Sequence, residues 1–96
     1  MASEKCIMPT SNKYSTVRYA GLERHEIFFG NERKKSIEDG LVVFLTPEAH
    51  RGTYGVHGKH GSEFNLELKR LGQLTAMSYY GWTTEEFIKR YGRNYL

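Results

Sequence analysis

Three of the four histidines stand beside two apolar stretches, and this arrangement constrains the fold more than any other feature. His25 lies near the end of one stretch, whereas His50 and His57 follow shortly after the apolar run Leu41–Leu45. Imidazole nitrogens bind zinc, nickel, cobalt and iron, and three of them leave one coordination position open for water or phosphate. The sequence therefore predicts that His25, His50 and His57 share one divalent transition metal, with zinc as the first choice.

His25, His60 and Cys6 also have interpretations that do not involve a metal, and the sequence leaves these open. His25, taken alone, could be a core residue whose ring is satisfied by hydrogen bonds. His60 follows glycine and lysine and is expected to be an exposed bystander. Cys6 is expected to be a free thiol, with a role as fourth ligand as the alternative.

Chain length and charge limit what surrounds such a site. The 96 residues suffice for one domain with a single modest core. The 14 Lys and Arg against 11 Asp and Glu give a net charge of +3, which permits a polyanionic partner without requiring one.

The single cysteine excludes an intrachain disulfide and a zinc site built mainly from thiolates, and it fits a reducing cytoplasm. No apolar run approaches the ~20 residues of a membrane span, and the first residues lack a signal-peptide pattern. We therefore expect a cytoplasmic protein without a membrane partner.

The first half of the chain has the pattern of a polar arm followed by two strands. Residues 1–16 show no clear period and are expected to form a loosely ordered arm or a weak hairpin. Strand residues around a turn are expected over Val17–Phe29, with the side chains of His25 and Glu26 on opposite faces. A charged loop is predicted over residues 30–36, and Leu41–Leu45 is predicted to be a buried strand.

A short helix is predicted directly after the second strand. Thr46 has the character of an N-cap and Pro47 that of a first helical residue, so the helix should carry His50 in its first turns. Glycines at positions 52, 55, 58 and 61 then predict a loop, which carries His57.

The last third of the chain is predicted to be helical. From Ser62 onward the apolar residues recur at helical spacing. Thr83–Glu86 matches a capping box and predicts a final short helix. The stripe expected to face the core in the longer helix consists of Phe64, Leu68, Leu71 and Leu74.

This order of elements resembles the ββα-metal unit of HNH nucleases, and the likeness extends to individual blocks. The chain is similar to small HNH-type proteins encoded by bacteriophages and prophages over roughly Leu22 to Leu96. The resemblance implies an α+β fold, in which a ββα-metal unit is followed by two C-terminal helices. It also implies a single HNH-like domain over residues 17–96 after the arm 1–16. The blocks that carry the resemblance are Leu22–Gly30, Gly40–Gly52, Gly55–His57 and Phe87–Leu96.

The chain departs from this family where catalysis would occur. The relatives carry two adjacent histidines, of which the second is the general base, but here the pair is His25-Glu26. A carboxylate of ordinary pKa is a weaker base than imidazole and adds negative charge beside a scissile phosphate. Glu26 is thus the one candidate catalytic residue, as an impaired base. Of the four zinc-knuckle ligands typical of the relatives, at most Cys6 remains.

Two functions are compatible with these features. In the first, the chain is a pseudonuclease that binds a protein partner, for instance as an inhibitor of a host defence nuclease of the anti-CRISPR type. In the second, it is an active metal-dependent endonuclease that nicks or cleaves DNA. The candidate partner-binding residues are basic or aromatic, and solvated loop and core roles remain the alternatives for them: Arg33, Lys34, Lys35, Arg51, Tyr80 and Trp82.

Overall fold

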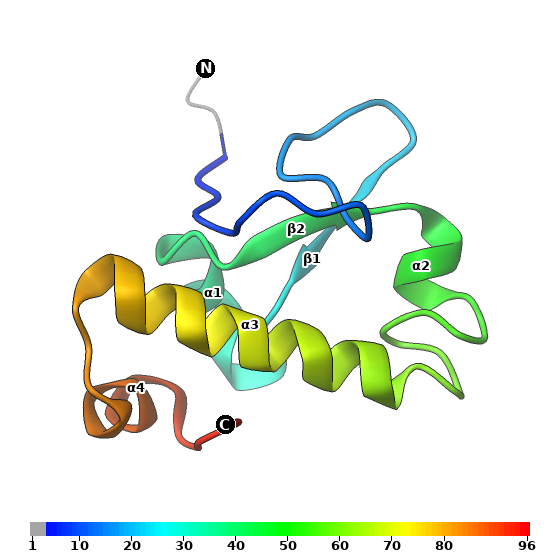
Figure 1. Ribbon diagram of the computed structural model, residues 1–96. Coiled ribbons are helices and arrows are strands. Elements are labelled where there is room, and N and C mark those ends of the chain that lie inside the picture. Colours follow the sequence, from blue (N-terminus) through cyan, green and yellow to red (C-terminus); the bar gives the residue numbers. More distant parts are fainter. Residues whose placement is uncertain (1–3) are drawn as a thin grey trace.

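A two-stranded antiparallel sheet lies between the N-terminal segment and a long helix (Figure 1). The computed structural model describes residues 4–96. The α+β fold class expected from the sequence is confirmed. The elements follow in the order β1 (Glu23–Glu26), the 3-10 helix η1 (Gly30–Glu32), α1 (Arg33–Glu38), β2 (Val42–Leu45), α2 (Pro47–Arg51), α3 (Ser62–Tyr80) and α4 (Thr84–Tyr91).

The register of the sheet places His25 opposite the centre of the core strand. β1 and β2 pair with His25 opposite Val43 and Glu23 opposite Leu45. All four residues of β2 are buried, as the apolar run 41–45 predicts. His25 is only 1% exposed, so its imidazole lies in the interior beside the sheet.

Residues 4–16 of the N-terminal segment, for which a loosely ordered arm or a weak hairpin was expected, pack against the free side of β2, and residues 1–3 lie outside the described part of the chain. The amide of Ile7 donates to the carbonyl oxygen of Gly40 at 2.9 Å, and Ser15 forms an isolated bridge with Phe44. Met8 and Tyr14 are 5% and 8% exposed and belong to the core. Met8 and Tyr14, together with the partly buried Cys6 and Ile7, hold this mostly polar stretch once a strand offers free backbone groups.

The charged stretch after β1 is helical rather than a loop. Residues 30–38 form η1 and α1, with the buried hydroxyl of Ser36 at the inner side. Ser36 Oγ accepts from the amide of Phe28 at 3.1 Å and donates to the carbonyl oxygen of Leu41 at 2.6 Å. Lysine and arginine are good helix formers, so the charges reside on an exposed helix face that the sequence pattern did not reveal.

The three downstream helices form where the sequence predicts them. Thr46 Oγ1 accepts from the amide of Ala49 at 3.1 Å and caps α2, and Thr83 and Glu86 complete the capping box of α4. α3 crosses the sheet closely, since a Cβ at Gly72 would lie 3.0 Å from Cγ2 of Ile27. Leu74, expected on the core side of α3, is 52% exposed, because the helix turns this position away from the sheet. Among residues 4–96 there is no helix with the length and apolar character needed to cross a membrane.

Candidate metal centre

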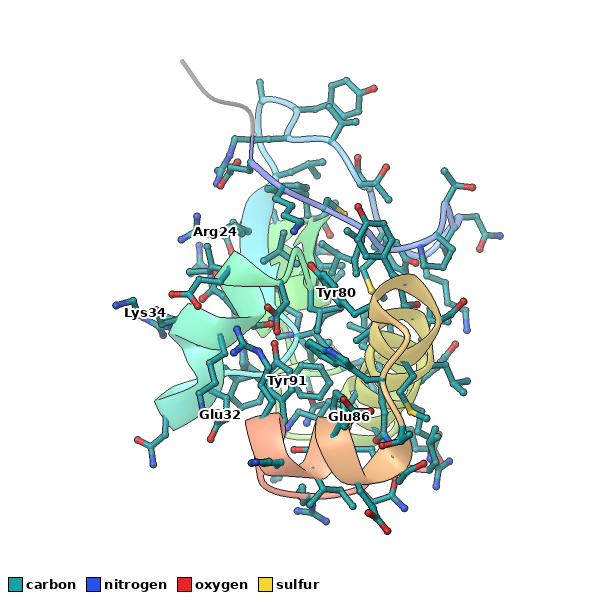
Figure 2. All side chains as sticks on the ribbon, turned by 90° about the vertical axis from the view of Figure 1, so that its left-hand side faces the viewer. Arg24, Glu32, Lys34, Tyr80, Glu86 and Tyr91 are labelled. Atoms are coloured by element: carbon teal, nitrogen blue, oxygen red, sulfur yellow. The ribbon has the colours of Figure 1, made fainter. Side chains whose placement is uncertain are left out.

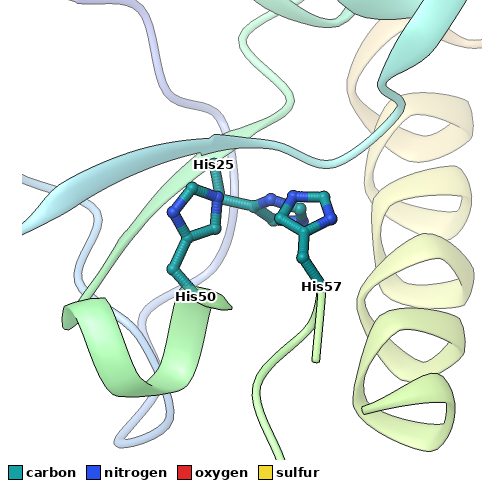
Figure 3. A group of neighbouring side chains, drawn as sticks. All are labelled: His25, His50 and His57. Carbon is teal, nitrogen blue, oxygen red and sulfur yellow. The ribbon is translucent and has the colours of Figure 1, made fainter. Parts of the chain in front are cut away.

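The three histidines singled out in the sequence come together at one end of the sheet. His25 extends from β1, His50 from α2 and His57 from the loop that follows (Figure 3). Their ring centroids are 5.2 Å (His25–His50), 5.0 Å (His25–His57) and 4.9 Å (His50–His57) apart. One ligand nitrogen from each ring lies within 4.8 Å of the others, so the group could hold a metal ion.

The environment of His25 fits a metal ligand better than a satisfied core histidine. Both ring nitrogens are buried, and neither has a hydrogen-bond partner among residues 4–96. A buried polar atom without a partner is costly and rare in native proteins. A metal ion bound to one nitrogen would remove that cost, and the donor set of three imidazoles suits zinc and its neighbours.

His50 is oriented by a carboxylate, as metal-binding histidines often are in natural sites. Glu23 Oε1 lies 2.9 Å from His50 Nδ1, which leaves Nε2 free to bind an ion. Arg51 holds the same carboxylate, with its Nη2 2.9 Å from Oε2. The hydrogen bonds from Arg51 and His50 lower the pKa of Glu23 to about 2, so the carboxylate stays charged.

The glycine-rich loop that carries His57 is a hydrogen-bonded coil. Three backbone amides of the loop donate to carbonyl oxygens seven residues earlier in the chain, at 2.8–2.9 Å. The pairs are Val56 to Ala49, His57 to His50 and His60 to Thr53. A Cβ at Gly58 would lie 1.8 Å from the carbonyl oxygen of Gly52. Backbone therefore packs directly on backbone, and glycine at every third position is what permits it.

Burial keeps two of the imidazoles in the metal-binding protonation state. It lowers the pKa of His25 to about 3, with smaller contributions from His57 and His50. Burial also lowers the pKa of His57, followed by the charge of His50. A metal binds the neutral imidazole, so both rings are ready to bind at neutral pH.

Glu26, the candidate base, is engaged by two arginines. Its Oε2 lies 2.9 Å from Arg24 Nε and its Oε1 lies 3.2 Å from Arg33 Nε. The side chain is 12% exposed, and it follows His25 in the strand, where successive side chains point to opposite faces. Both carboxylate oxygens are thus occupied by ion pairs.

The candidate basic residues differ in whether they are engaged in ion pairs. Arg51 pairs with Glu23 and Arg33 with Glu26, while Lys35 Nζ lies 3.1 Å from Glu32 Oε2 and donates to the carbonyl oxygen of Arg90. Lys34 projects from α1 into solvent (Figure 2). Arg33 and Arg51 flank the histidine group through their acidic partners, whereas the structure does not bring Lys34 and Lys35 into it.

Tyr80 and Trp82 lie at the other end of the molecule and are partly buried. Their rings stack at 4.7 Å, and Tyr80 donates its hydroxyl to the carbonyl oxygen of Asp39 at 2.7 Å. Tyr80 points inward between α3 and the sheet (Figure 2). Both residues pack against the core, and Trp82 retains a surface edge.

The remaining candidates lie outside the histidine group. His60 is exposed and stacks on Tyr54 at 5.5 Å, as its flanking residues predict. Cys6 is a free, half-buried thiol whose Sγ lies 3.1 Å from the carbonyl oxygen of Val42.

Sequence reasoning missed three residues beside the histidines. Glu23 was detectable in principle, because a carboxylate two residues before a strand histidine shares its face. Phe29 lies 4.8 Å from the His57 ring, and Lys69 Nζ lies 4.2 Å from the Phe29 ring centroid. Lys69 is brought to the site from α3 by tertiary packing, and no local pattern signals that.

Comparisons with known proteins add no relative. No protein-family model, no curated protein and no solved structure matches the chain at a significant level.

Proposed function

We propose that this chain is a metal-binding protein on an HNH-like scaffold, and that it acts by binding a partner rather than by cutting DNA. The ion is a divalent transition metal, with zinc as the first choice, and its ligands are His25, His50 and His57. The observation that carries the proposal is the convergence of three imidazoles around a buried His25 whose ring nitrogens have no other partner in residues 4–96.

The state of Glu26 supports binding without cleavage. An HNH reaction needs a base that takes a proton from water beside the ion. Arg24 and Arg33 form ion pairs with both oxygens of Glu26, so neither oxygen is free to contact a water molecule beside the ion without breaking a pair. The ion then serves to hold the fold and to present the surface around it.

The proposed partner is a component of a host defence nuclease, met in the cytoplasm of a bacterial cell. Support for this partner comes from the resemblance to phage-type HNH proteins together with the altered base position. The surface that would meet it includes the basic residues of α1 and the edge of Trp82.

An active endonuclease is the second candidate, and one observation favours it. His57 is exposed at the mouth of the histidine group, so a three-histidine ion would keep a coordination position open toward solvent. Such an open position is the mark of catalytic rather than purely structural zinc sites.

Metal analysis of untagged protein, paired with a plasmid-nicking assay, tests the proposal. Mg²⁺, Mn²⁺, Ni²⁺ and Zn²⁺ are each supplied in the assay. Stoichiometric metal without nicking is the expected result. Nicking by the purified protein that disappears in His25→Ala would support the endonuclease instead, and protein that binds none of the transition metals would contradict both.

A further inference from the structure

A surface pocket lies between α1 and α4, away from the histidine group. Its volume of about 410 Å³ is within the range of ~300–1,000 Å³ that is typical of ligand pockets. α1 and α4 meet beside it, where Lys35 Nζ donates to the carbonyl oxygen of Arg90 at 2.9 Å (Figure 2). The lining consists of one aromatic, three basic and one acidic residue: Trp82, Lys35, Lys89, Arg90 and Glu86.

The indole ring of Trp82 is the aromatic wall of this pocket. Tyr80 stacks on the indole with the ring centroids 4.7 Å apart and the planes 21° from parallel, which holds the ring in place. The guanidinium carbon of Arg90 lies 5.9 Å from the centroid of the Trp82 ring. Tryptophan and arginine are enriched among the residues that carry most of the energy of protein–protein binding. A fixed indole beside a guanidinium is therefore suited to contact a protein partner.

Arg90 is oriented by Asp39 and keeps donors for a further acceptor. Its Nη2 donates to Asp39 Oδ1 at 2.8 Å and its Nε donates to Asp39 Oδ2 at 2.5 Å. Its Nη1 has no hydrogen-bond partner within residues 4–96, and the long contact of Nη2 with Glu38 Oε2 measures 3.4 Å. A guanidinium has five N–H donors in a fixed plane, so the edge formed by Nη1 and Nη2 can bind a second carboxylate.

Lys89 supplies an unpaired positive charge at the same pocket. It is exposed, and none of the ion pairs within residues 4–96 includes it. Lys35, in contrast, is paired with Glu32. Glu86 is the one acidic residue of the lining, and its Oε1 accepts from the amide of Thr83 at 3.1 Å in the capping box of α4. The lining therefore carries an excess of positive charge beside an apolar ring.

We propose that this pocket binds an acidic segment of the protein partner, with one carboxylate at Arg90 and Lys89 and a neighbouring aromatic or apolar side chain on Trp82. The inference rests on the proposed function as a partner-binding protein, and it specifies the chemistry that the partner presents. The pocket is open on its outer side and would enclose only part of a small molecule. A protein segment gains further contacts around the rim, which makes it the better occupant.

Fluorescence titration of the zinc-supplied protein tests the inference, because Trp82 is the only tryptophan of the chain and reports on the pocket directly. The probes are two acetylated and amidated peptides that contain Glu-Phe or Phe-Glu between Gly-Ser flanks. In the matched control peptides Gln replaces Glu. At least one Glu peptide should change the Trp82 emission in a saturable way. Its Gln counterpart should bind ~10-fold more weakly, the scale of one charge-assisted hydrogen bond.

Two variants of α4 should change the affinity for the Glu peptide in opposite directions. Lys89→Gln should weaken binding by ~2–5-fold, the range of an exposed ion pair. Glu86→Gln should strengthen it by a similar factor, because it removes a negative charge while glutamine can still complete the capping box. Lys59→Gln, at an exposed lysine of the glycine-rich coil, is the matched control and should bind like the parent protein.

The outcomes separate this inference from the proposed function. Equal affinity for the Glu and Gln peptides, or no saturable response to either Glu peptide, would overturn the pocket alone when the plasmid assay shows no nicking. Changes of the same sign in Lys89→Gln and Glu86→Gln would also overturn it. A saturable response of Trp82 to a short oligonucleotide but not to the peptides would assign the pocket to nucleic acid instead. Nicking by the parent protein together with Glu-selective peptide binding would contradict the proposed function and leave the pocket in place.

Discussion

The backbone amide of His57 donates to the carbonyl oxygen of His50 at 2.9 Å, so two of the three converging histidines are joined through the main chain. The same seven-residue step recurs from Val56 to Ala49 and from His60 to Thr53. The distance between the two rings therefore depends on how closely the coil packs. Glycine spacing in the coil therefore helps to set the geometry of the three-histidine group.

Alanine at Gly58 should damage the site without touching a ligand. Its Cβ would lie 1.8 Å from the carbonyl oxygen of Gly52, so the coil must open and His57 must move. We expect a loss of ~1–3 kcal/mol of stability from the forced repacking. Zinc affinity should fall by ~10–100-fold, the range seen when a group that orients a ligand is lost. Thermal melting and competition with a chelator measure the two effects.

Gly21→Ala is the control for this substitution. Gly21 adopts φ +87, but no atom lies within 4 Å of the position that a Cβ would take there, so only backbone strain of ~1–2 kcal/mol is expected. Zinc affinity should be unchanged in this variant. Equal zinc affinity in Gly58→Ala and the parent protein would show that the coil does not set the position of His57.

Removal of a ligand should lower bound metal and thermal stability together. A ligand present at ~100 times its Kd stabilises the folded state by ~2.7 kcal/mol. In a domain of this size that corresponds to ~10–20 °C in Tm. His57→Ala should lose this increment in the presence of zinc, whereas His60→Ala, at an exposed histidine outside the group, should keep it. Full metal content and unchanged melting in His57→Ala would remove that residue from the site.

Histidine in place of Glu26 tests whether the residue at this position limits DNA cleavage. Glu26→His supplies an imidazole at the position where the HNH-type proteins that the sequence resembles carry their base, and it releases Arg24 and Arg33 from their ion pairs. We expect Mn²⁺-dependent plasmid nicking to appear or rise in this variant, since base catalysis contributes ~10²–10⁴-fold. Glu26→Ala is the matched control and should remain inactive. If the parent protein nicks DNA and folded Glu26→Ala does not, then Glu26 is a working base.

Tyr91 should make the fold sensitive to alkaline pH. Its buried hydroxyl donates to Asp39 Oδ2 at 2.6 Å, and burial followed by this carboxylate raises the pKa of the phenol well above its usual range. The unfolded chain releases the proton at pH ~10, whereas the folded chain retains it. The stability that Tyr91 contributes is therefore complete below pH ~10 and is lost as the pH rises beyond that value, by up to ~1.4 kcal/mol per pH unit.

Tyr91→Phe should flatten this alkaline loss while lowering stability at neutral pH. The lost hydrogen bond to a charged group is worth ~1.5–3 kcal/mol, and Arg90 remains to hold Asp39. Urea unfolding at pH 7 and above pH 10 measures both effects. The control is Tyr54→Phe, at an exposed tyrosine. A parent-like alkaline slope in Tyr91→Phe would assign the sensitivity to other groups.

Local chemistry determined the elements that the sequence could predict. The cap at Thr46, the capping box at Thr83 and the apolar run 41–45 are properties of neighbouring residues, so α2, α4 and β2 form where the pattern indicates. The histidines could be recognised as candidate ligands because three of them lie beside the two apolar stretches, although each alone could have had another role. The helices over residues 30–38 were missed because a charged helix face and a charged loop have the same composition.

Tertiary structure alone decided which groups surround the histidines. Arg24 shares the strand face of Glu26, but Arg33 reaches Glu26 and Lys69 reaches Phe29 only because α1 and α3 pack against the sheet. The burial of Met8 likewise depends on the free edge of β2, which exists only after the sheet has formed. Hydrophobic burial and backbone pairing act between residues that are close in space. The pattern of the sequence does not show which residues will become such neighbours.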